Sequence, residues 1–289
     1  MITVTISPSK PLFICNTLIQ YYIKQKTDNF TFLYREKIMK SAAKISLFFA
    51  TSCFVGAASA ATLDYRTEYK HDDEKYAHRI KISGQTKITN DTTLNYGVEQ
   101  KFHSSDQTKF WDKVEAGDSE FDWGVRYRIN KQWFVQPGMP VTFGDAKTTY
   151  KPQFRVGYIA SFGLTTALRY RHEFQVYTDD AGNKTLTDGT KMSVAGKTIE
   201  QGKWTLTGSY RFTDEALKNL RLSYEANYNK NYDKVRLSDG KDTQWDAGII
   251  VGYQMGKFQP YVELWTIDYG SSANDDRQLR TRLGIKYSS

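Results

Sequence analysis

The amino-acid sequence predicts an all-β protein, a 12-stranded antiparallel transmembrane β-barrel. Three observations lead to this prediction. Aromatic residues make up 15% of the 289 residues although the mean hydropathy is only -0.60. Apolar and polar residues alternate along most of the chain, and the alternating runs are joined by short links on one side and mostly long links on the other. A barrel in a membrane needs only an apolar outer face, so half of its strand residues can remain polar.

The N-terminal part of the chain has a different character. Residues 39–44 are basic, residues 45–57 form an apolar stretch, and Ala58-Ser59-Ala60 provides small residues for cleavage, which is the pattern of a signal peptide over residues 39–60. The apolar stretch is shorter than the roughly 20 residues that span a bilayer; a buried helix or an anchor is the alternative. We interpret residues 1–38, which precede a complete signal, as a spurious N-terminal extension. Residues 61–289 then form the outer-membrane β-barrel.

Charge and cysteine content exclude several classes of function for residues 61–289. Residues 1–60 contain seven of the 40 Lys and Arg but only two of the 32 Asp and Glu, so the predicted mature chain has a net charge of only +3. No motif for nucleic-acid binding is found, and we expect no nucleic-acid partner. Cys15 and Cys53 both precede residue 61, so a disulfide or a Cys-based metal site is not expected there. We expect no cofactor.

Twelve runs of alternating apolar and polar residues are predicted to be strands. They cover residues 62–70, 77–88, 92–102, 119–129, 132–143, 148–160, 163–174, 201–213, 217–229, 243–255, 258–269 and 276–287. In the fourth run, for example, Phe121, Trp123 and Val125 alternate with Asp122 and Arg126. A soluble β-sandwich would also alternate, with its charged face outward, so the alternation alone does not distinguish the two folds.

The links between the runs favour the barrel. Links after even-numbered runs are tight, whereas those after odd-numbered runs are generally longer, notably 103–118, 175–200 and 230–242. Bacterial outer-membrane barrels have short turns at one rim and long loops at the other, and an even number of strands. Tyrosines on the predicted outer face near run ends match the aromatic girdles of such barrels: Tyr65, Tyr69, Tyr96, Tyr127, Tyr150, Tyr158, Tyr170, Tyr210, Tyr228, Tyr253 and Tyr287.

The polar face of the runs would line the lumen, and arginine is its most frequent charged residue. We predict that these arginines bind substrate: Arg66, Arg79, Arg126, Arg128, Arg155, Arg169, Arg171, Arg211, Arg221, Arg280 and Arg282. Inward lysines add to them, and inward acids are fewer, namely Asp64, Glu68, Glu99, Asp122, Glu173, Glu225, Asp246 and Glu263. Twelve strands enclose a tube narrower than that of general porins, so a net cationic lumen is expected to be anion-selective.

Arginine suits carboxylates because its planar fork donates two parallel hydrogen bonds. Arginines two residues apart on one strand, as in Arg169 with Arg171 and Arg280 with Arg282, would be about 7 Å apart. Such a ladder could pass a polyanion from site to site. The alternative is that the arginines pair with the inward acids and stiffen the wall. Inward Phe134 and Tyr261 could stack on sugar rings, or could simply pack.

Four segments resemble the oligogalacturonate-specific porin family, of KdgM and NanC type, in matching order along the predicted mature chain. They are Ala61-Thr-Leu-Asp-Tyr-Arg66, Ala167-Leu-Arg-Tyr-Arg171, Gln259-Pro-Tyr-Val-Glu263 and residues 276–285. The resemblance implies a twelve-stranded monomeric barrel of the bacterial outer membrane that admits acidic oligosaccharides or sialic acid along arginine tracks. Barrels of this kind usually finish on or beside an aromatic residue that acts as an assembly signal. This chain departs from them, because Ser288 and Ser289 follow Tyr287.

Two other classes of function remain as alternatives. A hydrolase would need a catalytic motif, but His71, His78, His103 and His172 lie in none of those known for metalloproteases or serine hydrolases. An adhesin or structural barrel would use the long loops, which lack the exposed aromatic clusters of tight interfaces. Among channels, uptake of oligogalacturonate or related oligouronates is favoured over a sialic-acid porin, because each uronate carries a carboxylate that a stepped row of arginines can bind.

Overall fold

The computed structural model describes residues 61–237, 240–269 and 276–289. Their regular structure is entirely β, in sixteen strands. The strands are β1 (Ala61–Lys70), β2 (Lys75–Lys87), β3 (Thr92–Ser104), β4 (Val114–Arg128), β5 (Trp133–Gly138), β6 (Val141–Phe143), β7 (Lys147–Tyr150), β8 (Gln153–Ile159), β9 (Leu164–Tyr177), β10 (Asn183–Thr185), β11 (Lys191–Ser193), β12 (Thr198–Arg211), β13 (Leu220–Asn231), β14 (Thr243–Tyr253), β15 (Phe258–Asp268) and β16 (Arg277–Ser288). Within these residues no helix is both long and apolar enough to cross a membrane.

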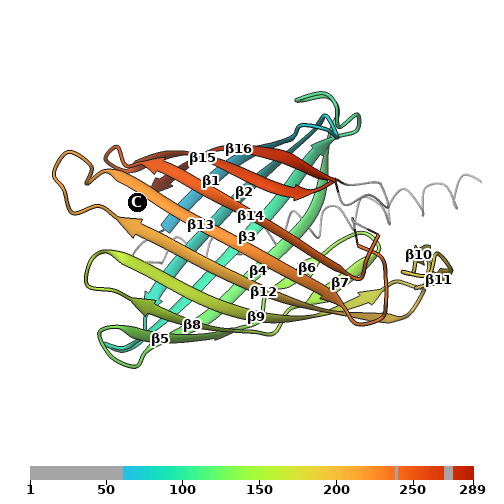
Figure 1. Cartoon of the computed structure of the whole chain (residues 1–289), viewed down its shortest axis with the longest axis horizontal. Helices are drawn as coiled ribbons and strands as arrows, with labels where there is room; N and C mark the ends of the chain where they lie inside the picture. Colours follow the sequence, from blue (N-terminus) through green and yellow to red (C-terminus); the bar gives the residue numbers. More distant parts are fainter. Residues whose placement is uncertain (1–60, 238–239, 270–275) are drawn as a thin grey trace, which may run out of the picture. The chain divides into compact units, whose positions relative to one another are not determined.

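Fourteen of these strands form one antiparallel sheet that closes into a barrel (Figure 1). Strands β1 to β4 and β12 to β16 pair in sequence order, β9 pairs with β12, and β1 closes the barrel by pairing with both β2 and β16. Strands β5 and β6 together occupy one position in the wall, as do β7 and β8. The wall therefore has twelve positions, and the predicted 12-stranded antiparallel barrel is confirmed.

Two predicted runs are interrupted by proline. The run at 132–143 divides at Met139 and Pro140, and the run at 148–160 divides at Lys151 and Pro152. Proline has no backbone N–H to donate to a neighbouring strand, so a regular ladder stops there. The wall stays closed because the Lys151 N–H donates to the Pro140 carbonyl at 2.9 Å.

The two faces of the wall differ as the alternation predicts. The outward phase carries large apolar side chains that are exposed, including Leu63, Tyr127, Trp133, Phe154, Leu168, Trp204, Leu206, Leu222, Tyr228, Trp245, Ile249, Leu264, Leu279, Leu283 and Ile285. Exposed apolar side chains on every part of a wall are expected where lipid, not water, is the solvent. The opposite phase, here called the inner face, carries the polar and charged residues.

The two rims also differ. Links of four to eight residues, at 88–91, 129–132, 160–163, 212–219 and 254–257, lie at the rim that holds both strand ends Ala61 and Ser288. We call this the short-turn rim. The opposite rim carries the long segments 105–113, 178–197 and 232–242, although its links at 71–74 and 144–146 are short.

Two of the long loops fold together beyond the wall. Segment 178–197 contains the β10–β11 hairpin, which lies past the ends of β9 and β12 (Figure 1). It bridges to loop 232–242 through Leu186 and Val235. Val194, Ile199 and Val235 pack with Tyr177 in a small apolar core. The loops therefore have their own core, which the polar composition of segment 175–200 did not suggest. The predicted extension and signal peptide, residues 1–60, lie outside the described residues.

Candidate functional site

The inner face of the barrel carries two groups of arginines that differ in their partners. The first group lies on the neighbouring strands β1, β2, β3, β15 and β16, and we call it the paired wall. It consists of Asp64, Arg66, Glu68, Arg79, Glu99, Glu263, Arg280 and Arg282. The second group lies across β4, β8, β9 and β12, and we call it the open wall. It consists of Arg126, Arg155, Arg169 and Lys203.

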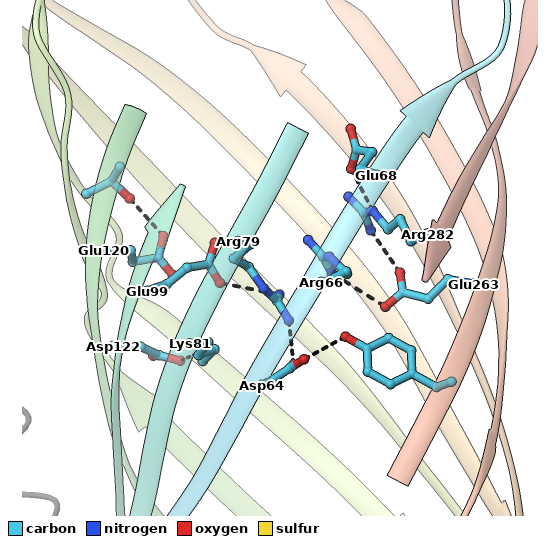
Figure 2. Close-up of polar contacts among 12 residues, drawn as sticks. Asp64, Arg66, Glu68, Arg79, Lys81, Glu99, Glu120, Asp122, Glu263 and Arg282 are labelled. Carbon is cyan, nitrogen blue, oxygen red and sulfur yellow. Dashed lines mark hydrogen bonds and ion pairs between the residues drawn. The ribbon is translucent and has the colours of Figure 1, made fainter. Parts of the chain in front are cut away.

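In the paired wall, Arg79 and Arg282 each lie between two carboxylates (Figure 2). Arg79 donates to Asp64 at 2.5 Å and to Glu99 at 3.4 Å. Arg282 donates to Glu68 at 2.6 Å and to Glu263 at 3.0 Å. Each of these two guanidinium groups is therefore compensated by two carboxylates, which weakens its attraction for an anionic ligand.

The remaining members extend the same network. Arg66 contacts Glu263 at 3.5 Å, and Arg280 contacts Glu68 at 3.8 Å. Arg280 and Arg282 also lie near the ring of Trp265, at 4.8 and 5.1 Å from its centroid. The interpretation that arginines pair with inward acids and stiffen the wall therefore applies to this part of the barrel.

Tyr261 closes the paired wall rather than presenting its ring to the lumen. Its hydroxyl donates to Asp64 at 2.7 Å, across the intervening strand β16. The ring lies over Gly284, its cross-strand partner, where a Cβ would come within 2.3 Å of the ring. The residue is only 5% exposed, so the suggestion that it stacks on sugar rings does not match its position.

The open wall contrasts with this arrangement. Among the described residues, Arg126, Arg155, Arg169 and Lys203 make no ion pair with a carboxylate. The Arg126 guanidinium instead lies over the ring of Phe134, with 3.6 Å from Cζ to the centroid. Arg169 donates to the hydroxyl of Thr205 at 3.0 Å. These cations keep their charge uncompensated by a direct partner.

Two acids of this region, Glu225 and Asp246, are bound by an amide. Asn227 donates to Glu225 at 2.9 Å and to Asp246 at 2.7 Å. Its own carbonyl accepts from Thr205 at 2.8 Å. Asn227 therefore lies between the acids of β13 and β14 and the hydroxyl that holds Arg169.

Arg171 is intermediate between the two groups. It donates to Gln153 at 2.9 and 3.1 Å and lies 3.8 Å from Glu173. Beside it, Lys151 donates to Glu120 at 2.8 Å. The ladder predicted from Arg169 and Arg171 therefore has one member without an ion-pair partner among the described residues and one in a loose pair.

Three of the predicted site residues lie at the short-turn rim rather than within the wall. Arg128 and Arg211 are the last residues of β4 and β12, and both are exposed. Arg221, next to the link 212–219, donates to the carbonyls of Lys218 and Leu220. Arg221 thus caps its turn. Because all three arginines lie at the short-turn rim, they form a rim group that is separate from the two walls.

A cavity of about 380 Å³ adjoins the open wall. It is lined by Arg126, Phe134 and Arg155, with Glu225 and hydroxyl side chains of β9, β12 and β13. A second cavity of about 260 Å³ lies against the paired wall, next to Arg66, Arg79 and Arg282. The charged and polar linings of both cavities suit water and polar ligands better than an apolar molecule.

The sequence interpretation missed how glycine positions the inward aromatics. Phe134, Trp265 and Tyr261 are each the direct cross-strand partner of a glycine on the inner face, namely Gly157, Gly248 and Gly284. Each ring lies where the Cβ of another residue would be. A glycine on the polar phase of a predicted strand, opposite an aromatic residue, was the signal that could have identified them.

Comparison with known proteins assigns this architecture to a family. A family model described as "Oligogalacturonate-specific porin protein (KdgM)" matches residues 54–289. The chain belongs to this family. It is therefore an outer-membrane porin, and its location is the bacterial outer membrane.

Individual relatives agree with the family assignment. The oligogalacturonate-specific porin KdgM of Dickeya dadantii (strain 3937) is 28% identical over 235 residues, which cover 80% of this chain and 92% of the relative. The N-acetylneuraminic acid outer membrane channel protein NanC of Escherichia coli (strain K12) is 24% identical over 128 residues, which cover 42% of this chain and 49% of the relative.

Solved structures support the fold. The NanC porin superimposes with a TM-score of 0.58 at 15% identity, over 78% of this chain and 98% of NanC. An outer membrane channel from Pseudomonas putida F1 gives a TM-score of 0.56 at 11% identity, over 80% and 95% of the two chains. At these identities the likeness extends to the barrel architecture alone.

The histidines do not form a catalytic cluster within the described part of the chain. His78 and His172 lie on the outward phase of β2 and β9, and His78 is bound by the carbonyl of Phe110 at 2.7 Å. No group of His, Cys, Asp and Glu suited to a metal ion occurs among the described residues. The relatives named above are porins or channels.

Proposed function

We propose that this porin takes up acidic oligosaccharides, with oligogalacturonate or related oligouronates as its substrates, through an anion-selective lumen. The observation that carries the proposal is the open wall, where four cations face inward without a carboxylate partner among the described residues. An uncompensated guanidinium can bind a carboxylate through two parallel hydrogen bonds. Fields of lumen charges are incompletely screened over the Debye length of about 8 Å.

The spacing of these cations suits a polymer with one carboxylate per sugar. Arg155 and Arg169 are directly opposed across β8 and β9, and Lys203 is opposed to Arg171 across β9 and β12. Adjacent strands are about 4.8 Å apart, so a band of positive charge runs around this side of the lumen. A polyanion can exchange one cation for the next along such a band.

The substrates named for two relatives support the same chemistry. KdgM, which matches over 92% of its length, is named for oligogalacturonate, and NanC is named for N-acetylneuraminic acid. Both ligands are sugar acids. We favour oligouronates because the open wall offers several carboxylate-binding cations, whereas a monomeric sialic acid needs fewer.

The proposed functional unit is a monomer of residues 61–289. Strand β1 begins at Ala61, whose N–H donates to the Ser289 side chain at 3.1 Å, and the Ser289 N–H donates back to the Ala61 carbonyl at 3.0 Å. A signal peptide that ends at Ala60 would release this pairing strand. The intact mass of the protein purified from membranes tests the processed terminus, and a mass that includes residues before Ala61 would contradict it.

Single-channel recording tests the proposed function. The refolded barrel in a planar bilayer is expected to give anion-selective current that oligogalacturonate blocks and a neutral oligosaccharide of equal length does not. N-acetylneuraminate serves as the second acid. Block by N-acetylneuraminate but not by oligogalacturonate would replace the proposed substrate, and current without block by either acid would remove the proposal.

A further inference from the structure

Phe134 on β5 has an unusual position for an inward aromatic residue. Its side chain is on the inner face but only 3% exposed. The guanidinium carbon of Arg126 lies 3.6 Å from the ring centroid, which is direct contact between the cation and the π face. A cation held in this way is attracted by the negative face of the ring. The ring is therefore covered by Arg126 and is not presented to a sugar.

The other side of the ring is fixed by the neighbouring strand. Phe134 is the cross-strand partner of Gly157 on β8. A Cβ at position 157 would come within 2.0 Å of the ring tip, so only glycine allows the ring to lie on the backbone there. Phe134 is thus held between the backbone of β8 and the guanidinium of Arg126, and it has little freedom to change its rotamer.

An arginine that is held by an aromatic ring keeps its full positive charge, whereas an arginine that is paired with carboxylates does not. Arg79 uses its terminal nitrogens on Asp64 and Glu99. Arg126 is held by its flat face, which leaves the N–H donors in the guanidinium plane and does not neutralise the charge. Arg126 and Arg155 line the same cavity of about 380 Å³ and lie near enough for their charges to interact.

We propose that Phe134 is a positioning residue of the channel, which holds the Arg126 guanidinium so that Arg126 and Arg155 together form a carboxylate subsite near the short-turn rim. The subsite would take one acidic sugar unit of an oligouronate, and this assignment rests on the proposed function. Arg126 is two residues before the end of β4 at that rim. The subsite is therefore placed where a translocating chain leaves the open wall.

Variants of Phe134 separate a positioning role from simple packing. Phe134→Leu keeps an apolar side chain and every charge but removes the π face, so block by trigalacturonate is expected to weaken about three- to tenfold, as loss of a cation–π support implies. The reversal potential in a KCl gradient is expected to stay the same, because no charge is removed.

Phe134→Tyr is the conservative variant, and its block by trigalacturonate should stay at the wild-type level, in contrast to Phe134→Leu. The same barrel already accommodates a tyrosine over a glycine at Tyr261 and Gly284, where the hydroxyl lies 2.4 Å from the position of a Cβ. A second route to the same defect is Gly157→Ala, whose Cβ would displace the ring without changing Phe134 itself. Heat-dependent migration on SDS gels checks that each variant is folded.

The outcomes distinguish the inference from the function on which it rests. Weakened block in Phe134→Leu and Gly157→Ala, with wild-type block in Phe134→Tyr, supports the positioning role. Normal block in a folded Phe134→Leu channel overturns the inference and leaves the proposed function intact. A wild-type channel that trigalacturonate does not block overturns both.

Discussion

The paired wall and the open wall carry the same type of residue, on the same face of one barrel, in different electrostatic states. In the paired wall, Glu68 and Glu263 are both direct cross-strand partners of Arg282. In the open wall, Arg155 is opposed to Gln136 and Arg169, and Arg169 is opposed to Thr205. The neighbouring strands thus decide whether an arginine is neutralised. The comparison separates arginines that hold the wall together from arginines that can bind an anion.

The largest effect is expected from the open wall. Arg155→Ser combined with Arg169→Ser should shift the reversal potential in a KCl gradient toward zero and weaken oligogalacturonate block more than tenfold. Hydrogen bonds to charged groups contribute about 1.5–3 kcal/mol each, which for two arginines exceeds a factor of ten. Folding should be unaffected because neither residue has an ion-pair partner among the described residues.

The matched control is the pair Lys109→Ser and Lys218→Ser, which removes two positive charges from the links 105–113 and 212–219 instead of the open wall. Its reversal potential should remain close to that of the wild type. An open-wall variant with the same reversal potential as this control would show that lumen cations do not set selectivity.

The paired wall should respond in stability instead. Arg282→Ser leaves the side chains of Glu68 and Glu263, which are 15% and 9% exposed, without their shortest ion pairs. Breaking such a pair costs about 3 kcal/mol, because the two buried carboxylates keep only their longer contacts with Arg280 and Arg66. Unfolding in urea, followed by tryptophan fluorescence, measures the loss, and Glu68→Gln in the same background should recover part of it. An unchanged unfolding midpoint in Arg282→Ser would remove the structural role of the paired wall.

A smaller loss of stability is expected at Gly284. Gly284→Ala would place a Cβ 2.3 Å from the Tyr261 ring, and the ring would have to move from its hydrogen bond with Asp64. Overpacking of this kind costs about 1–3 kcal/mol. In a Tyr261→Leu background, the same Gly284→Ala change should lower the free energy of unfolding much less. Equal losses in both backgrounds would mean that the ring is not held by the glycine.

The smallest effect concerns pH at the rim of long loops. Hydrogen bonds from Lys230 and Lys234 hold the pKa of Asp242 below its ordinary value. A lowered pKa in the folded state means that the contact stabilises the loop above the ordinary pKa and is lost as the pH falls through the lowered pKa. The hydrogen-exchange protection factor of the Asn231 amide, which donates to the Asp242 carbonyl, should fall only in that acidic range. The same acid-dependent fall in protection in Asp242→Asn would exclude this carboxylate as the cause.

Much of the fold could be predicted from the sequence because it depends on local alternation. The twelve predicted runs correspond to the twelve wall positions, and the exposed side chains such as Leu168 and Trp204 are on the predicted outer phase. The interruptions at Pro140 and Pro152 were missed. A single proline can also occur at a strand edge or a bulge, so the residue type alone does not place a break.

The division into two walls could not be predicted, because it depends on contacts between strands that are distant in sequence. Arg66 meets Glu263 across β16, 197 residues further along the chain. The alternation assigned both residues to the inner face but not to each other. Phe134 was predicted to face inward. That the Arg126 guanidinium lies over its ring follows from the register of β4 and β5 and from the missing side chain at Gly157.

The reversal potential of the wild-type barrel in a KCl gradient tests the central claim most directly. If the cations of the open wall are uncompensated and face the conducting path, chloride carries most of the current and the potential has the sign of an anion-selective channel. A cation-selective or non-selective potential would contradict this assignment, because it would mean that the inward arginines are neutralised throughout the barrel.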